Sequence, residues 1–281
     1  MHNAMRRLLA DFTTLLALLA LAMLLLLAAL APLLAPDPTR PDLFALEQPP
    51  SPAHLLGTDA LGRDVLARLL YGGRVSLAVG VAAAALAGVV GVALGLAAGT
   101  LGGLADGLIM RLTDLVYAFP FLPLAVAVAA VAGPGLWHTV LLIGLLSWPG
   151  AARLVRAECL SLREADFVRA AVAAGAGSWR IALRHLLPGA LPPALVWASL
   201  NVGAAVLAEA GLSFLGLGVR PPTASWGNML AAAQSLRALR SEPWLWVPPG
   251  VAVFVAVLAI NLCGDALRDA LDPWLSQKQK S

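Results

Sequence analysis

The residues of this sequence that could do chemistry are few, and their spacing matches no common catalytic or metal-binding pattern. Cys159 and Cys263 lie far apart, the four histidines are scattered, and there is no HExxH or CxxC motif. Such a distribution supports neither a disulfide framework nor a metal site. The first lysine is Lys278, so the chain has no GxxxxGK[ST] nucleotide-binding loop. The sequence therefore predicts no catalytic, metal or cofactor site in this chain.

Glu209 is the most deeply placed acidic residue, near the end of a long apolar stretch. A carboxylate inside a membrane span is a candidate polar site, for example for a peptide amino terminus or a cation. The alternative role is structural, in which Glu209 caps or orients the LSFLGLG turn that follows it. Its position within about one turn of the span's end favours the structural role.

The largest cluster of charge is basic and lies between two apolar stretches. It contains six arginines: Arg153, Arg156, Arg163, Arg169, Arg180 and Arg184. The segment READFVRAAVAA, residues 163–174, is rich in helix formers, and Gly175 and Gly177 predict a turn after it. A second short helix is expected from about Ser178, as its cap, to Leu187, ending at Pro188.

The first of these short helices has an unusual face. Phe167, Ala170, Ala171 and Ala174 recur at three- to four-residue spacing and share one side of it. One large aromatic among alanines suits a knob that docks into a socket on another protein. The alternative is an amphipathic helix on lipid, with arginines toward anionic headgroups. Such a helix would carry several bulky apolar residues, so the alanines favour protein docking.

The composition decides the class of protein that must position these residues. The chain is 60% hydrophobic and only 12% charged, against about 25% charged in soluble domains. An all-α polytopic membrane protein is therefore predicted. The net charge of +3 does not indicate a nucleic-acid interface, because the basic residues are spread among apolar spans without stacking aromatics.

Six uncharged stretches are long enough to span a bilayer. They are Phe12–Leu34, Val75 to about Gly99, a stretch after Asp114 to about Gly133, Leu136–Ala152, about Gly189–Ala208 and about Trp246–Gly264. Prolines in the third and fifth spans (Pro120, Pro123, Pro192 and Pro193) predict kinks or breaks. The first span is too long for a signal-peptide h-region and is expected to remain uncleaved.

Loop charges predict the orientation. Placing both termini in the cytoplasm puts the six-arginine loop inside, together with Arg6, Arg7, Lys278 and Lys280. The predicted organisation is a tail, first span and start of an outer loop (1–60), a domain with the other five spans (74–268) and its cytoplasmic loop (156–188), and a cytoplasmic tail (269–281).

Three further segments carry predictions. Gly91, Gly95, Gly99 and Gly103 recur at i+4 spacing and form a face for close helix packing, or alternatively a mobile gate. Residues 58–64 predict a turn and short outer or interfacial helix with local pairing among Asp59, Arg63 and Asp64. SWGNMLAAAQSLRALRSEPWLW predicts a short helix near the outer surface, with interfacial anchors Trp226, Trp244 and Trp246.

The basic loop resembles the EAA loop of ABC importer permeases. The matching positions are Ala170, Ala171, Gly175, Leu187 and Pro188, with Arg169 in place of the family's glutamate and His185 in place of its isoleucine. FVRAAVAAGAGSWRIALRHLLPGALPP is similar to the form in the dipeptide/oligopeptide/nickel subfamily. HLLGTDALGRDVLARLLYGGRVSL and AEAGLSFLGLGVRPPTASWGNML resemble other segments of its C-type subunit, so the resemblance covers about residues 5–272.

This resemblance implies a six-span, type I (MetI-like) importer permease in the bacterial inner membrane. Its loop would be a coupling helix that docks into a cleft on an ATPase, with Phe167 as the central contact and Arg169 beside it. The implied partners are two ATPase subunits, which bind ATP and Mg²⁺, a second non-identical permease, a periplasmic or lipid-anchored binding protein that meets the outer segment, and membrane lipid.

Other functions remain open at this stage. Peptides are the expected substrate, with nickel chelates, glutathione or another small solute as alternatives. An ion-coupled secondary transporter would need carboxylates at mid-membrane, and uptake without ATP would indicate it. An intramembrane enzyme would need a catalytic pair within the spans, and hydrolysis by the isolated chain would indicate that.

Overall fold

The computed structural model describes residues 12–271, and within them the chain is helical, with only an isolated bridge between Thr58 and Asp64. The predicted all-α fold is confirmed. The elements are α2 (Phe12–Leu34), α3 (Val65–Leu101), α4 (Gly103–Ala118), α5 (Phe121–Ala132), α6 (Leu136–Arg163), α7 (Asp166–Ala173), α8 (Ser178–Ile181), the π-helix Ala182–Leu186, α9 (Leu187–Phe214), α10 (Trp226–Leu230), α11 (Leu236–Ser241) and α12 (Val247–Leu271). The terminal charges Arg6, Arg7, Lys278 and Lys280 lie outside the described residues.

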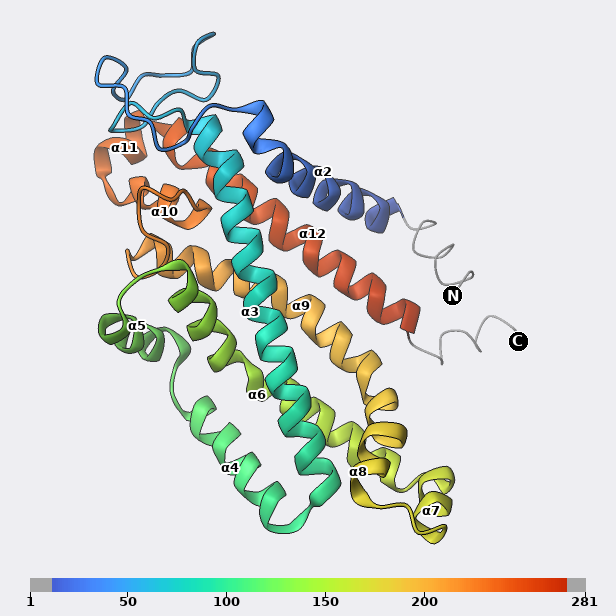
Figure 1. The fold of residues 1–281 in the computed structure, drawn as a ribbon. Helices are drawn as coiled ribbons and strands as arrows, with labels where there is room; N and C mark the ends of the chain where they lie inside the picture. Colours follow the sequence, from blue (N-terminus) through green and yellow to red (C-terminus); the bar gives the residue numbers. More distant parts are fainter. Residues whose placement is uncertain (1–11, 272–281) are drawn as a thin grey trace.

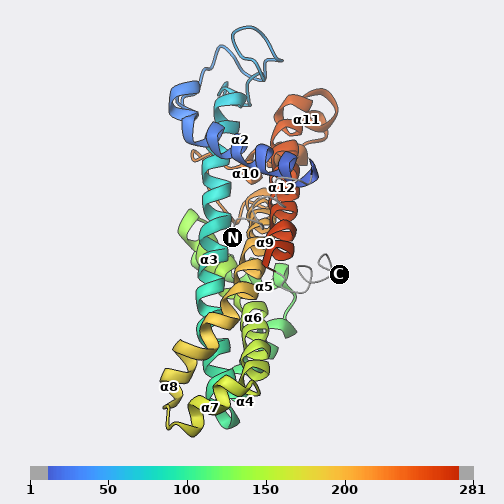
Figure 2. The ribbon, with the colours of Figure 1, turned by 90° about the vertical axis from the view of Figure 1, so that its right-hand side faces the viewer.

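The long helices form an elongated bundle (Figure 1). Helix α3 packs along α6 and α9, while α12 packs against α9 and α2. Helices α7 and α8 lie at one end of the bundle, and α10 and α11 lie at the other (Figures 1 and 2). The first of these ends is called the coupling end below, and the second the outer end.

Five continuous helical segments are long and apolar enough to cross a membrane. The predicted third span is instead a pair, α4 and α5, bent by 90° at its break. The count reaches six only if this pair is one broken span. Pro120 is the residue before α5, as expected of a residue whose ring prevents a continuous helix.

Of the predicted kinks or breaks, no break occurs at the other three prolines. Pro192 and Pro193 lie inside the continuous helix α9, and Pro123 lies in the first turn of α5, where few intrahelical N–H partners are lost. The loop helix also does not stop at Pro188. Its residues pass through the π-helix directly into α9, so residues 178–214 form one uninterrupted helical segment.

Several helices extend beyond their predicted ends. Helix α3 begins at Val65, where Asp64 accepts a hydrogen bond from the Ala67 N–H (2.8 Å), a typical N-cap. Helix α6 continues to Arg163, so the first arginines of the predicted loop lie on a helix. Because the first turns of α3 and the last turns of α6 contain arginines, a search for uncharged stretches could not locate these two ends.

The outer end differs from the prediction in detail. Residues 58–64 form a turn without the predicted helix, and the segment from Trp226 to Leu245 contains short α and 3₁₀ pieces rather than a single helix. Trp226 is no interfacial anchor, because it is buried and its indole N–H donates to the Leu69 carbonyl (3.0 Å). The pair Asp59–Arg63 forms as predicted (2.7 Å), but Asp64 contacts His54.

Candidate functional site

The candidate site is the loop at the coupling end, centred on α7. The helix begins after Ala165 with Asp166 in its first turn, where a carboxylate interacts favourably with the helix dipole. It ends at Gly175, whose φ of +83° is easily adopted only by glycine. The Gly175 N–H donates to the Val172 carbonyl (2.9 Å) and the Ala176 N–H to Ala171 (3.0 Å). These two bonds form a Schellman motif that closes the short helix.

One side chain attaches α7 to the rest of the molecule. Val168 is only 2% exposed and belongs to a cluster with Cys159, Ala182 and Leu186. Its neighbour Phe167 is 52% exposed. The helix therefore buries a valine and leaves its largest apolar side chain available to another molecule.

The surroundings of Phe167 are small and charged. Ala170 is exposed and Ala171 half-buried, so a partner can approach the backbone closely on this side. Arg169 forms an ion pair with Glu164, and both side chains are largely exposed. Such a pair contributes little to stability. The His185 ring lies 6.4 Å from the Phe167 ring, centroid to centroid.

The return from the loop is helical throughout. Gly177, not Ser178, is the N-cap of α8, and no side chain caps it, so the predicted serine cap is wrong. The π-helix Ala182–Leu186 follows, with Pro188 in the first turn of α9. Leu186 is fully buried and Leu187 half-buried. The turn at residues 174–177 therefore joins α7 to a segment that is helical from Ser178 to Phe214.

Three arginines of the basic cluster tie membrane helices together rather than facing lipid. Arg156 of α6 makes two bonds to Asp106 of α4, at 2.5 and 2.6 Å. Arg163 donates to the Gly99 carbonyl at the end of α3 (3.1 Å). Arg153 binds Asp114 (2.6 Å). The ends of α3, α4 and α6 are thus held beside the loop that α6 leads into.

The contact between α3 and α6 depends on glycines. A Cβ at Gly91, Gly95 or Gly99 would come within 2.3–2.5 Å of atoms of α6, including the Ala152 backbone oxygen. Such distances leave no room for a side chain. Gly103 differs from the prediction, because it lies at the start of α4 with nothing within 4 Å of its added Cβ.

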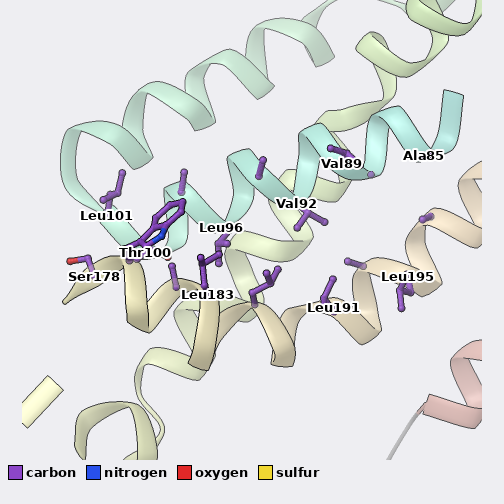
Figure 3. Close-up of a pocket in the computed structure, with 18 residues that line it drawn as sticks. Ala85, Val89, Val92, Leu96, Thr100, Leu101, Ser178, Leu183, Leu191 and Leu195 are labelled. Atoms are coloured by element: carbon purple, nitrogen blue, oxygen red, sulfur yellow. The ribbon is translucent and has the colours of Figure 1, made fainter. Parts of the chain in front are cut away.

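An apolar groove runs from the loop along the bundle, between α3 and the α8–α9 segment (Figure 3). Its volume is about 790 Å³. Leu183 and Leu191 project into it from one side, and Val92 and Leu96 from the other. Ser178 and Thr100 lie at its coupling end. The groove therefore joins the surface of the loop to two membrane helices.

Glu209 occupies a different part of the bundle, near the outer end. Its carboxylate is fully buried, and it accepts hydrogen bonds from Ser76 of α3 and Ser213 of α9, both 2.7 Å. Ser76 Oγ in turn accepts from the Trp226 N–H (3.1 Å), and Ser213 Oγ from the Val219 N–H (3.0 Å). This chain of bonds orients the turn after α9 and attaches α10 to α3.

Sequence reasoning missed the burial of Val168 and the pair between Arg156 and Asp106. The sequence shows the acid before one apolar stretch and the arginine after the next, which is a signal for such a pair. It does not show how the two helices are aligned, so the partners could not be assigned. Among residues 12–271, no cluster of three or more His, Cys, Asp or Glu side chains could hold a metal ion.

A bundle of helices that are long and apolar enough to cross a membrane indicates a multi-pass membrane protein. The comparisons make this specific: the chain belongs to the family of binding-protein-dependent transport system inner membrane components, whose model matches residues 91–277. It is therefore a multi-pass permease subunit of an ABC importer, and such a permease functions with ATPase and binding-protein partners.

Three curated relatives cover most of the chain. A Brucella suis protein with the provisional name of peptide permease is 45% identical over 97% of this chain and 91% of its own length. The di/tripeptide permease DppC of Pseudomonas aeruginosa is 44% identical over 92% of this chain and 87% of its own length. The glutathione permease GsiD of Pectobacterium atrosepticum is 41% identical, covering 83% and 77%.

Among solved structures, a chain of the inward-facing MetNI methionine ABC transporter is similar in fold. Its TM-score is 0.57 at 21% identity, and the match covers 73% of this chain and 96% of that chain. At this identity the likeness concerns the fold alone, and it agrees with the type I importer permease architecture.

Proposed function

We propose that this chain forms part of the membrane path of a peptide importer in a bacterial inner membrane, with both termini in the cytoplasm. The relatives named for peptides and di/tripeptides, at 45% and 44% identity, support this substrate class. The arginines at the coupling end support the orientation, since basic residues favour the cytoplasmic side.

The proposed mechanism is mechanical, and no bond of the substrate is made or broken in this chain. Two separate ATPase subunits bind ATP and Mg²⁺, and closure of their dimer moves α7. The observation that carries this proposal is the exposed Phe167 beside the buried Val168. The aromatic side chain enters a cleft on the ATPase, while the alanines and Gly175 allow close approach. The continuous segment 178–214 carries the movement to α9.

A second, non-identical permease completes the path in this proposal. The apolar groove between α3 and α9 supports a protein partner there, because it runs from the coupling loop along both helices that must move. Lipid covers the outward faces of α2 and α12, where Leu19, Leu26 and Phe254 are exposed. The binding protein meets the outer end, near α10 and α11.

Replacement of Phe167 by aspartate tests the proposal. We expect Phe167→Asp to abolish transport and substrate-stimulated ATP hydrolysis in the importer purified with its partners, because a charge cannot enter an apolar socket without a large desolvation cost. Val172→Asp is the matched control, since Val172 is 55% exposed on another side of α7. Membrane insertion, measured by the amount of folded protein, should be equal in both variants.

Transport at the wild-type rate by the Phe167 variant would contradict the docking role. Glutathione is the second candidate substrate, favoured by the relative GsiD at 41% identity. Competition between glutathione and dipeptides for uptake into the same proteoliposomes separates the two: dipeptide uptake that excess glutathione does not reduce supports the peptide assignment.

A further inference from the structure

A small polar pocket is lined by residues of the start of α3 and of α10. The start of α3 and α10 lie at the outer end of the bundle, opposite to α7 (Figure 1). The pocket has a volume of about 150 Å³. It lies where the turn before α3, the first residues of α3 and helix α10 meet. Its polar lining comprises Asp59, Arg63, Arg68 and Asn228, and its apolar lining includes Val65, Met229 and Leu245.

Arg68 is the unusual residue of this pocket. It is only 4% exposed, yet its hydrogen bonds are incomplete. Its Nε lies 3.5 Å from an Asp59 oxygen, and its Nη2 lies 3.4 Å from Asn228 Oδ1, both long for such contacts. Its Nη1 has no hydrogen-bond partner within residues 12–271. A buried guanidinium in this state is costly unless something else accepts from it.

The charges around the pocket do not balance. Its lining has two cations, Arg63 and Arg68, and one anion, Asp59. Asp59 is already engaged, because one oxygen accepts from the Arg63 Nε (2.7 Å) and the other from turn N–H groups. The next carboxylate, Asp64, contacts His54 at 2.9 Å and caps α3. One positive charge is therefore left in excess.

We infer that this pocket binds one carboxylate group. A carboxylate supplies the single negative charge, and its two oxygens match the planar fork of a guanidinium. The apolar lining suits the short aliphatic stem that carries such a group. A metal cation would be repelled by the excess positive charge.

Two sources of the carboxylate follow from the proposed function, on which this part of the inference rests. One is an acidic side chain of the binding protein docked on the outer end. The other is the C-terminal carboxylate of an arriving peptide. The existence of the site itself does not depend on either source.

Acetate is the probe for the site. The importer in lipid nanodiscs is titrated with ¹³C-acetate and binding is followed by saturation-transfer NMR. We expect Arg68→Lys to weaken acetate binding about tenfold or more, because a charge-assisted fork is lost. Asp59→Asn should strengthen it about threefold or more, because the competing negative charge is removed. Arg237→Lys is the control, as Arg237 is an exposed arginine at the same end, paired with Glu47.

A binding site predicts that acetate affinity falls in Arg68→Lys and rises in Asp59→Asn. If the two residues only form a structural ion pair, neither variant should bind acetate more tightly than the wild type. If Arg68→Lys does not fold, acetate binding to Asp59→Asn still tests whether the pocket binds a carboxylate. Acetate that does not bind, or binds equally to wild type and Asp59→Asn, would overturn the inference and leave the pocket to water.

Docking then identifies the source. If Arg68→Lys weakens docking of the substrate-free binding protein and acetate competes with it, the carboxylate belongs to the binding protein. If docking is unchanged but uptake of a free-acid dipeptide falls relative to its C-terminal amide, it belongs to the substrate. If neither changes, both proposed sources of the carboxylate are wrong, and the acetate titration alone decides whether the site exists. Activity of the Phe167→Asp and Val172→Asp pair reports on the proposed function separately.

Discussion

At the scale of single residues, the packing of α3 against α6 depends on glycines, which have no side chain. At Gly95 the two helices are so close that an added Cβ atom would lie 2.5 Å from the Ala152 backbone oxygen. In a membrane, close packing of this kind is a main source of helix association, because lipid offers apolar groups the same environment as protein. The stability of the α3–α6 contact therefore depends on positions that hydropathy treats as neutral.

This leads to a prediction with a built-in control. Gly95→Ala should lower the free energy of unfolding by about 1–3 kcal/mol, because the backbone of α6 must move to admit the methyl group. Gly107→Ala, in α4 with nothing within 4 Å, should raise it by about 0.5–1 kcal/mol, since alanine is the better helix former. Unfolding of the detergent-solubilised variants measures both. Equal effects at the two positions would contradict the packing argument.

The same scale explains Glu209. One oxygen accepts from the Ser76 hydroxyl of α3 and the other from the Ser213 hydroxyl of α9. Both hydroxyls accept from backbone N–H groups of the segment after α9. A carboxylate enclosed in this way is satisfied without a substrate or an ion. The geometry thus supports the structural role over direct contact with the transported molecule.

At the scale of elements, α7 is a short helix that depends on its ends. It has eight residues, too few for a helix to be stable alone. Val168 anchors it on one side, and the Schellman motif at Gly175 closes it. Its rigidity in the docked state therefore depends on a residue in the left-handed region.

We expect Gly175→Ala to loosen α7 without affecting the bundle. A side chain at φ +83° costs about 1–2 kcal/mol. This cost destabilises α7 itself, because few other contacts hold this helix in place. Gly177→Ala is the control, because Gly177 has a φ of −68° and open space around it. Hydrogen exchange of residues 166–174 should rise in the first variant only. Unchanged exchange would show that tertiary contacts alone hold α7.

At the scale of the whole molecule, the two ends of the bundle differ in kind. The helical loop with α7 lies at the coupling end, and the short helices α10 and α11 lie at the outer end (Figures 1 and 2). The loop exposes Phe167, whereas hydrogen bonds of buried polar groups join α10 to α3 and α9. The proposed mechanism needs these ends on opposite sides of the membrane.

Labelling from one side tests that arrangement. In a background where Cys159 and Cys263 are replaced by alanine, a membrane-impermeant maleimide should label Leu236→Cys in intact spheroplasts, because Leu236 is 72% exposed on α11. Ala176→Cys, in the loop after α7, should react only after permeabilisation. The reverse pattern would invert the proposed orientation.

The sequence predicted the parts of the fold that depend on local composition better than the parts that depend on contacts between distant segments. Apolar runs located α2 and the cores of α3, α6, α9 and α12, because burial in lipid requires a minimum length of uncharged helix. They did not locate the charged end of α6, which extends to Arg163. Two arginines of this end, Arg153 and Arg156, pair with acids of α4.

The site shows the same division. The alanine–glycine pattern predicted the turn at Gly175, which a local backbone preference determines. It could not decide which of Phe167 and Val168 is buried, because that choice depends on Ala182 and Leu186 in the returning helix. Likewise, nothing in the spacing shows that Arg68 is left with an unpartnered nitrogen, since its partners come from two distant segments.

The most direct test of the central claim is a cross-link from position 167. With a photoreactive phenylalanine analogue at position 167 in the intact importer, irradiation should join this chain to the ATPase subunit. The same analogue at Val172, about equally exposed, should give much less of that product. Cross-links from position 167 to lipid, with none to the ATPase, would contradict the account and make α7 a membrane-surface helix.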